Sequence, residues 1–324
     1  MELDKIYQLI EADLAKVNEE IRSVSSVEYP WLAEMLGHSV QSGGKRIRPA
    51  LTLLAGKLFD YDLKYLLPMA TAVELMHTAT LVHDDAIDKS ATRRGRPTIY
   101  AVWGVEKSVL LGDYLFAKAG EYNAGTQSIR TVRLFTQTLM TISKGELYQS
   151  VNAFNPHQTR EQYIQRIIGK TASLFAMATE SGAILSQAPE WAVGDLKAYG
   201  QNLGIAFQIV DDILDFIGTE EELGKPVGSD LTQGTLTLPA MILLERYPQN
   251  NPVQRIFERG EGKYDREDIR QAIEMAGNAR VVQECYDMAS RYSAEACRQL
   301  ENLPQCDSRQ ALADLATYVV RRKK

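Results

Sequence analysis

The feature that most constrains the fold is a pair of acidic motifs set among hydrophobic residues. Residues 84–88 and 211–215 both read Asp-Asp-x-x-Asp, flanked by Leu, Val and Ile. On a helix, the first and last aspartates of each motif share a face, where like charges four residues apart are destabilising. Burial adds a desolvation penalty, so cations must offset both effects. The aspartates are Asp84, Asp85 and Asp88 in the first motif and Asp211, Asp212 and Asp215 in the second.

Magnesium ions meet this requirement. Mg²⁺ is a hard cation that one or two carboxylates hold, while phosphate oxygens and waters complete its octahedral shell. Two such motifs predict facing helices that bind one polyphosphate through shared ions. A single motif could equally be a solvated acidic helical turn, but two copies in hydrophobic surroundings favour the metal site. The chain has 42 acidic and 36 basic residues, so the six motif aspartates account for its acidic excess.

Hydrophobic periodicity predicts an all-α fold. An amphipathic helix is expected near the N-terminus, where hydrophobic residues recur at helical spacing. No period-two alternation bounded by hairpin turns is evident, so we expect no sheet. The sequence lacks a low-complexity linker and its two motifs lie in different halves, which predicts one domain over residues 1–324. Helices are predicted at 2–21, 50–59, 67–88, 104–124, 127–150, 160–187, 190–217, 235–246, 266–276 and 279–301.

Composition excludes several classes of protein. No Lys/Arg block is long enough to indicate nucleic-acid binding. Cys285, Cys297 and Cys306 lack Cys-x-x-Cys spacing, which predicts reduced thiols rather than zinc ligands or disulfides. The longest uncharged segment, residues 231–244, is too short to span a bilayer, and the N-terminus lacks a signal-peptide core. We therefore expect a soluble cytoplasmic protein.

Basic residues lie on both sides of the first motif. Lys45, Arg46 and Arg48 belong to a Gly-rich segment, and Arg93 and Arg94 follow the motif closely. Arg binds phosphate oxygens bidentately and Lys supplies a compact charge, so two phosphate sites are predicted, one of them reached through Mg²⁺. Alternatively, the arginines simply pair with the aspartates.

Several ordered blocks resemble those of the trans-type (all-E) polyprenyl diphosphate synthases over nearly the whole chain. The blocks are residues 43–49, 81–88 with Arg93-Arg94-Gly95, 112–115, 169–172, 207–215 and 224–231. The resemblance implies head-to-tail 1'-4 condensation of isopentenyl diphosphate onto an allylic diphosphate. It also implies an all-α bundle around a central cavity, a homodimer, and about three Mg²⁺ ions per site with Mn²⁺ as a substitute.

The resemblance also implies roles for individual residues. Lys45, Arg48, His77 and Arg94 would hold the isopentenyl diphosphate. Asp84, Asp88 and Asp211, with their partners Asp85, Asp212 and Asp215, would bind Mg²⁺ bridging the allylic diphosphate. Arg93, Lys170 and Lys225 would contact that diphosphate, and Thr171 and Gln208 would lie beside the allylic carbon. By contrast, His83 is interpreted as a packed histidine, because Mg²⁺ disfavours imidazole.

Small residues before the first motif predict a long product. Ala79 and Thr80 lie about one turn before Asp84, where short-chain members of the family typically carry an aromatic residue. The resemblance to the medium- and long-chain branch implies about six to ten isoprene units, each matching roughly one helical turn. The tunnel floor could be Met76, or Phe116 and Met140 from other helices, or Ala79 could simply mark a helix crossing. A product of this length could bring weak membrane association.

Two features of the sequence stand apart from the family pattern or have no role in it, and four alternative functions remain. Thr235 replaces a lysine that many relatives carry, so one phosphate contact is in doubt, and the basic tail at residues 321–324 has no assigned role. A shorter-chain synthase remains an alternative. A class I terpene cyclase would usually carry a different second motif. A non-catalytic subunit would be expected to lose aspartates, and a structural helical scaffold would have no use for buried acidic clusters facing arginines.

Overall fold

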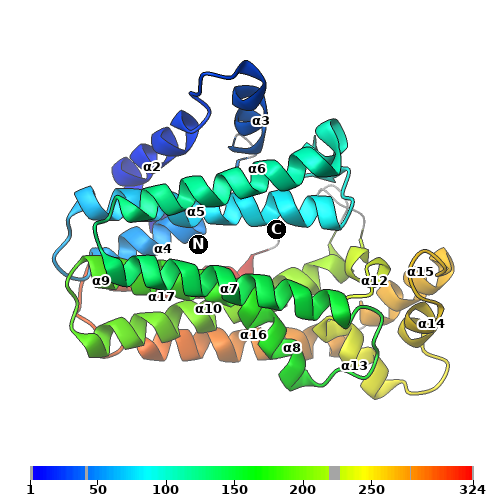
Figure 1. The fold of residues 1–324 in the computed structure, drawn as a ribbon. Helices are drawn as coiled ribbons and strands as arrows, with labels where there is room; N and C mark the ends of the chain where they lie inside the picture. Colours follow the sequence, from blue (N-terminus) through cyan, green and yellow to red (C-terminus); the bar gives the residue numbers. More distant parts are fainter. Residues whose placement is uncertain (1–2, 41–42, 219–226, 278, 323–324) are drawn as a thin grey trace. The chain divides into compact units, whose positions relative to one another are not determined.

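The computed structural model describes residues 3–40, 43–218, 227–277 and 279–322 of the 324-residue chain. These residues are almost entirely helical, which confirms the predicted all-α class (Figure 1). The chain divides into two compact units. Unit 1 comprises Met1–Leu139, Leu174–Gly200 and Ala296–Leu315, and unit 2 comprises Met140–Ser173, Gln201–Glu295 and Ala316–Lys324.

The elements follow one another with short connections. The first half of the chain contains α1 (Leu3–Tyr7), the 3₁₀ turn η1 (Gln8–Ile10), α2 (Glu11–Ser23), α3 (Pro30–Val40), α4 (Ile47–Gly56), α5 (Leu63–Ile87), β1 (Thr92–Arg93), β2 (Arg96–Pro97), α6 (Ile99–Ala124) and α7 (Ile129–Val151). The second half contains α8 (Arg160–Ile167), the π-helical turn η2 (Ile168–Ala172), α9 (Ser173–Leu185), α10 (Glu190–Ile217), α12 (Ser229–Thr232), α13 (Leu238–Arg246), α14 (Pro252–Arg259), α15 (Arg266–Ala276), α16 (Ala279–Gln299) and α17 (Asp307–Arg321).

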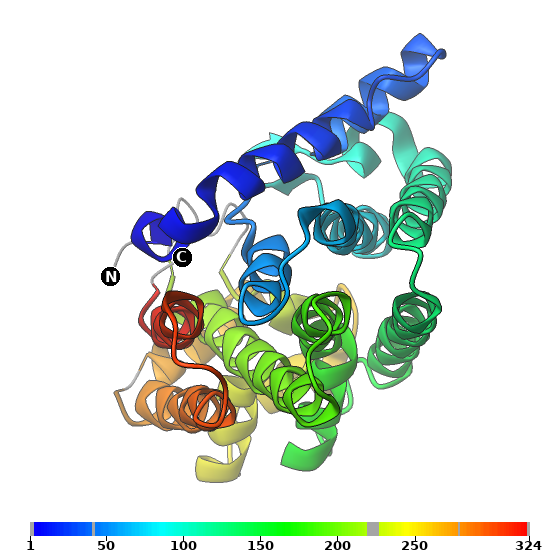
Figure 2. The ribbon, with the colours of Figure 1, turned by 90° about the vertical axis from the view of Figure 1, so that its left-hand side faces the viewer.

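Helices α5 and α6 form the centre of unit 1 and lie side by side over much of their length (Figure 1 and Figure 2). Helix α5 begins where the Asp62 side chain accepts a hydrogen bond from the Lys64 amide at 2.9 Å, and it ends within the first acidic motif. The Thr98 hydroxyl caps α6 in the same way. Figure 2 also shows α2 running along α4 and α5, which it contacts.

A short hairpin joins α5 to α6. Strands β1 and β2 pair antiparallel, with Thr92 opposite Pro97 and Arg93 opposite Arg96. The two central residues, Arg94 and Gly95, have φ values of 53° and 73°, as a type I′ turn requires. The sequence pattern predicts no sheet. Strands of two residues are too short to show hydrophobic alternation, so the pattern gave no signal.

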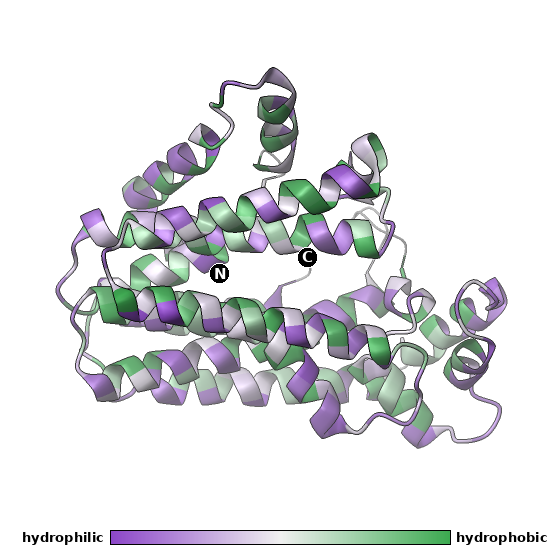
Figure 3. Ribbon diagram, in the orientation of Figure 1, coloured by the Kyte–Doolittle hydropathy of each residue, from purple (hydrophilic) through white to green (hydrophobic). Residues whose placement is uncertain are grey.

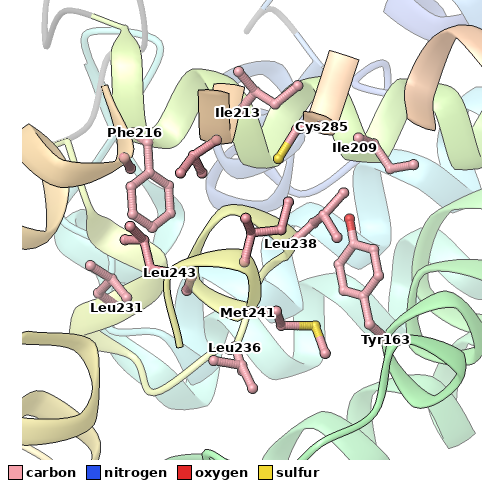
Figure 4. Packing of buried hydrophobic residues seen from close by; sticks show 14 of the residues in the cluster. Tyr163, Ile209, Ile213, Phe216, Leu231, Leu236, Leu238, Met241, Leu243 and Cys285 are labelled. Atoms are coloured by element: carbon pink, nitrogen blue, oxygen red, sulfur yellow. The ribbon is translucent and has the colours of Figure 1, made fainter. Parts of the chain in front are cut away.

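The core of unit 2 gathers around the second half of α10 (Figure 4). Ile209, Ile213 and Phe216 recur at helical spacing and are almost fully buried. Leu238 of α13 and Tyr163 of α8 pack into the same cluster. This packing holds one face of α10, and the second acidic motif lies on that helix.

The predicted helix at 160–187 is interrupted where site residues are expected. The π-helical turn η2 separates α8 from α9 and contains Lys170 and Thr171. Gly145 of α7 lies close against this turn: a Cβ at residue 145 would stand only 3.1 Å from the Gly169 carbonyl carbon. A π turn inserts an extra residue into a helix, and such turns are frequent at functional sites.

Some helices lie where the sequence pattern predicts none. The sequence pattern predicts no helix at α3, α14 or α17. Helix α3 begins at Pro30, which suits a first helical turn. Hydrophilic and hydrophobic residues alternate along α6 and α7, as Figure 3 shows. Across the described ranges, none of the helices combines the length and hydrophobicity needed to cross a membrane.

Candidate active site

The first acidic motif lies at the C-terminal end of α5, beside the hairpin. Asp85 is buried, and both of its oxygens accept hydrogen bonds from Arg93, with Nε 2.9 Å from Oδ1 and 3.1 Å from Oδ2. Burial raises the pKa of Asp85, although Arg93 opposes that shift. Asp84 and Asp88 are half-buried, four residues apart on one helical face.

Arg93 supplies one positive charge beside this motif. Burial lowers its pKa, but the hydrogen bond to Asp85 and the charges of Asp85, Asp84 and Asp88 outweigh burial and raise it. The alternative in which an arginine pairs with the aspartates therefore describes Arg93 and Asp85. The pair orients the guanidinium beside the other two carboxylates of the motif.

Arg94 joins the hairpin to the Gly-rich segment before α4. Its guanidinium donates a hydrogen bond to the Gly43 carbonyl oxygen. A Cβ at Gly44 would stand 3.0 Å from Nη1 of Arg94, and Gly43 has a φ of 67°, so both positions favour glycine. The structure thus brings together the two basic segments that the sequence predicted to bind phosphate.

Arg46 anchors the Gly-rich segment and faces a carboxylate. It occupies the left-handed region at φ 52°, and its guanidinium contacts Glu74 at 2.5 Å and Asn18 at 2.9 Å. With Arg46 fixed in this way, the segment leads into α4, which carries Arg48. The Arg48 guanidinium lies 4.8 Å from the centre of the Phe175 ring. Lys45 is half-buried in the same segment.

A pocket in unit 1 is bounded by the Gly-rich segment, α5 and the hairpin. Its polar lining includes His38, Arg46, Glu74, His77, Asp85, Arg93, Arg94 and Arg96. The hairpin carries three lining arginines, Arg93 and Arg94 before Gly95 and Arg96 after it, so the pocket presents several planar guanidinium groups. Such groups suit the bidentate binding of phosphate oxygens.

His77 lies in this pocket as a neutral imidazole. Burial lowers its pKa well below the ordinary value, and the charges of Arg48, Arg94, Arg93 and Arg46 lower it further. A neutral ring has one donor and one acceptor nitrogen. An anion entering the pocket would reverse the electrostatic effect of the arginines and favour a second proton on the ring.

His83, the other histidine of this region, packs against α6. Its Nε2 lies 2.9 Å from the Val109 carbonyl oxygen, and its ring meets Phe116 edge-on at 5.5 Å. A Cβ at Gly112 would come within 2.1 Å of the ring, so glycine makes room for it. These contacts agree with the interpretation of His83 as a packed histidine.

In unit 2, the three aspartates of the second motif have different surroundings. Asp215 is buried, and its carboxylate accepts hydrogen bonds from the Ser229 hydroxyl at 2.8 Å and the Asp230 amide at 3.1 Å. These bonds hold the start of α12 against α10. Asp211 has 41% of its side chain exposed and pairs with Arg322 at 2.5 Å.

Asp212 is buried and accepts two hydrogen bonds. The donors are the Tyr163 hydroxyl at 2.7 Å and the Gln208 side-chain amide at 2.8 Å. Burial and then the charge of Asp230 raise the pKa of Asp212, while these two hydrogen bonds oppose the rise. Gln208 in turn accepts a hydrogen bond from the Thr171 hydroxyl at 2.6 Å.

Lys170 lies in the π-helical turn next to Thr171. Its ammonium pairs with Glu146 of α7 at 2.9 Å, which orders the side chain beside the turn. Lys225, the other predicted diphosphate contact, lies outside the described residues. Unit 2 therefore contains Lys170, Thr171, Gln208 and the second motif, and unit 1 contains the first motif with Lys45, Arg48, His77, Arg93 and Arg94.

The residues predicted to set product length lie on α5. Ala79 and Met76 are fully buried. Thr80 is half-buried, and its hydroxyl donates to the His77 carbonyl oxygen at 2.7 Å. Of the two alternative floor residues, Phe116 is half-buried against His83, and Met140 is 64% exposed.

The aspartates suit a metal that takes only part of its shell from protein. Among the described residues, no group of three or more His, Cys, Asp or Glu side chains could hold an ion by itself. Two carboxylates at Asp84 and Asp88, with Asp85 engaged by Arg93, match a cation that completes its shell with phosphate oxygens and water. Mg²⁺ has this preference, whereas a closed structural site would need more protein ligands.

Sequence reasoning missed the partners that position these residues. Tyr163 precedes Lys170 by seven residues, but the π-helical turn interrupts the regular spacing by which the two could have been assigned to one face. Glu146 and Arg322 are brought to the site by tertiary contacts, and neither has a local motif. Arg322 is buried, stacks on Phe207 at 3.7 Å and donates to Asp211, so it gives part of the basic tail a defined place.

Comparisons with known proteins agree on one family. The family model described as polyprenyl synthetase matches residues 29–276. Component 2 of the heptaprenyl diphosphate synthase of Geobacillus stearothermophilus is 39% identical, with 99% of each chain covered. A decaprenyl diphosphate synthase structure from Rhodobacter capsulatus gives a TM-score of 0.91 at 38% identity, with 100% of each chain covered. A polyprenyl synthase from Caulobacter crescentus, complexed with calcium and isoprenyl diphosphate, gives 0.95 at 34% identity, with 100% of this chain and 98% of that chain covered.

Proposed function

The chain belongs to the polyprenyl synthetase family, and from this premise we propose that it is a prenyltransferase acting on isopentenyl diphosphate and an allylic diphosphate. The reaction joins the two head to tail and yields an all-E polyprenyl diphosphate. The resemblance expected from the motifs is confirmed by the family match and by relatives that cover the full length.

The observation that carries this proposal is the arginine-lined pocket of unit 1. Arg93, Arg94 and a neutral His77 line it together, beside Asp84 and Asp88. A diphosphate matches the pocket in charge and in its capacity to accept several hydrogen bonds. A terpene cyclase uses no isopentenyl diphosphate, and a second basic pocket beside the acidic motif would have no purpose there.

The site residues can support ionisation of an allylic carbon-oxygen bond. The bond's electron pair leaves with the diphosphate, so positive charge around the leaving group stabilises the transition state. Mg²⁺ held by the aspartates of each motif would supply part of that charge. Arg93 and Lys170 would add to it directly. The isopentenyl double bond then attacks the allylic carbon, and the released diphosphate is the proton acceptor that we propose.

We place the product at about six to ten isoprene units, since each unit matches roughly one helical turn. Ala79 of α5 presents only a methyl group, so its own side chain would not obstruct a growing tail at that position. Relatives named for heptaprenyl and decaprenyl products fall within this range. A shorter-chain synthase is not favoured by these relatives.

Large hydrophobic side chains exposed on α6 and α7 support assembly with a second subunit. They are Val102, Val105, Val109 and Leu110 on α6, and Ile129, Val132, Met140, Leu147 and Val151 on α7. A monomer seldom exposes so many such residues on two consecutive helices. We propose a homodimer. The name of the Geobacillus relative, which designates a component, makes a different partner subunit the competing form of assembly.

Incubation with isotopically labelled isopentenyl diphosphate, an allylic primer and Mg²⁺ tests this function. The purified chain alone should incorporate the label into a longer prenyl diphosphate and should sediment as a dimer. A terpene cyclase would convert the primer without incorporating label. A chain that incorporates label only when a second protein is added would be one component of a heteromeric synthase.

A further inference from the structure

Four side chains of unit 2 form one continuous line of hydrogen bonds. The Tyr163 hydroxyl donates to Oδ2 of Asp212 at 2.7 Å, and Nε2 of Gln208 donates to Oδ1 of the same carboxylate at 2.8 Å. The Thr171 hydroxyl then donates to Oε1 of Gln208 at 2.6 Å. The line thus runs from α8 through α10 to the π-helical turn.

The direction of each bond fixes the orientation of the Gln208 amide. Nε2 of Gln208 donates to Oδ1 of Asp212, whose Oδ2 already accepts from the Tyr163 hydroxyl, so the NH₂ group of Gln208 faces Asp212. The carbonyl oxygen consequently faces Thr171. With the amide reversed, its oxygen would face the Asp212 carboxylate and its NH₂ group would face the Thr171 hydroxyl.

Tyr163 has no direct route to a substrate. Its side chain is fully buried in the hydrophobic core of unit 2, and Figure 4 shows it among the core residues. The guanidinium of Arg166 lies 5.4 Å from the centre of its ring. A hydroxyl held this deeply can act only through the group that accepts its hydrogen bond, which is Asp212.

We propose that Tyr163 is a positioning residue that, through Asp212, keeps the carbonyl oxygen of Gln208 directed toward Thr171 and the allylic carbon. The inference rests on the proposed function. An oriented carbonyl dipole stabilises a developing allylic cation, whereas the positive end of an NH₂ group opposes it. Loss of Tyr163 should therefore slow ionisation without weakening diphosphate binding.

The test compares Tyr163→Phe with Tyr199→Phe. Tyr199 of unit 1 is also fully buried, and its hydroxyl makes one hydrogen bond, to the Leu312 carbonyl oxygen at 2.8 Å. Both variants lose one buried hydroxyl, so their melting temperatures serve as matched controls. We expect kcat for condensation to fall roughly tenfold to a hundredfold in Tyr163→Phe alone, with the KM for isopentenyl diphosphate little changed.

A double-mutant cycle separates positioning from a structural role. In a Gln208→Met background the additional change Tyr163→Phe should lower kcat little further, because there is no amide left to orient. Replacement of Tyr163 by 4-aminophenylalanine retains a donor and should retain most of kcat, which keeps the test valid if Tyr163→Phe is poorly folded.

Three results would overturn the inference. They are an unchanged kcat in Tyr163→Phe, an equal loss in the Gln208→Met background, and an equal loss in Tyr199→Phe. Failure of the wild-type chain to incorporate isopentenyl label would instead count against the proposed function, so the two failures are distinguishable.

Discussion

Substituting Ala79 with tyrosine should shorten the product while turnover continues. Ala79 is fully buried on α5 and lies five residues before Asp84. At a rise of about 1.5 Å per residue, it stands about 7.5 Å along the helix from Asp84, which is predicted to hold the allylic diphosphate through Mg²⁺. A phenol ring there would narrow the tunnel near its start, so we expect a product of farnesyl or geranylgeranyl size, as in the short-chain family members that typically carry an aromatic residue near this position.

Two further alanines of α5 test how product length depends on position along the helix and on the helical face. Ala72 is also fully buried, and seven residues place it on nearly the same face about 10.5 Å further along. Ala72→Tyr should therefore give a product about two isoprene units longer than Ala79→Tyr. Ala70, equally buried, lies nine residues from Ala79, on the opposite face. Ala70→Tyr should leave the product unchanged.

The assay is chromatography of the dephosphorylated products, with melting temperatures measured in parallel. Overpacking a buried site costs about 1–3 kcal/mol, so all three variants should melt earlier by comparable amounts. Product length separates the tunnel from a simple packing defect. An unchanged product in Ala79→Tyr, or equal shortening in Ala70→Tyr, would contradict the proposed tunnel. Either result would mean that the tail follows a different path.

Three other perturbations address the site. Asp84→Asn and Asp211→Asn should each lower kcat by about a hundredfold and raise the Mg²⁺ concentration needed for half-maximal rate; an unchanged Mg²⁺ titration would contradict metal binding there. Arg322→Gln should lower kcat roughly fivefold, because Asp211 is half-exposed and its charged hydrogen bond to Arg322 is worth only about 1 kcal/mol. As a control, Arg321→Gln changes an exposed neighbour and should match wild type. Burial, followed by nearby guanidinium charges, lowers the pKa of His77, so the unfolded chain binds a proton below pH about 6.5 that the folded chain does not. Stability should thus fall as the pH drops below that value, and less steeply in His77→Gln; parallel melting curves against pH would contradict this.

The helical class and the first basic cluster were predictable because their signals are local. Hydrophobic spacing located α5 and α10, and the glycines at 43 and 44 marked a segment that approaches another chain segment closely. The hairpin was not predictable from alternation, because each of its strands has two residues. Only the positive φ of Arg94 and Gly95 reveals the turn that aims the arginines.

The different surroundings of the aspartates within each acidic motif could not be predicted from the sequence. Asp85 and Asp88 are chemically identical, yet Asp85 is buried and accepts hydrogen bonds from Arg93 through both oxygens, whereas Asp88 is only half-buried. In the second motif, Asp212 is held by Tyr163, which lies far away in sequence. Such differences arise from tertiary packing, which a five-residue motif does not encode.

The basic tail illustrates the same limit. Its sequence indicated only a charged terminus, whereas the structure buries Arg322 against Phe207 and joins it to Asp211. A buried guanidinium needs an acceptor and a stacking surface, and both come from α10. The neighbouring Arg321 is exposed, so charge alone does not distinguish the two.

The most direct test of the account is the product formed by the purified chain from labelled isopentenyl diphosphate and farnesyl diphosphate in the presence of Mg²⁺. After dephosphorylation, we predict labelled all-E alcohols that extend to about six to ten isoprene units. Label that remains in unconverted isopentenyl diphosphate, with the farnesyl primer cyclised or untouched, would contradict it.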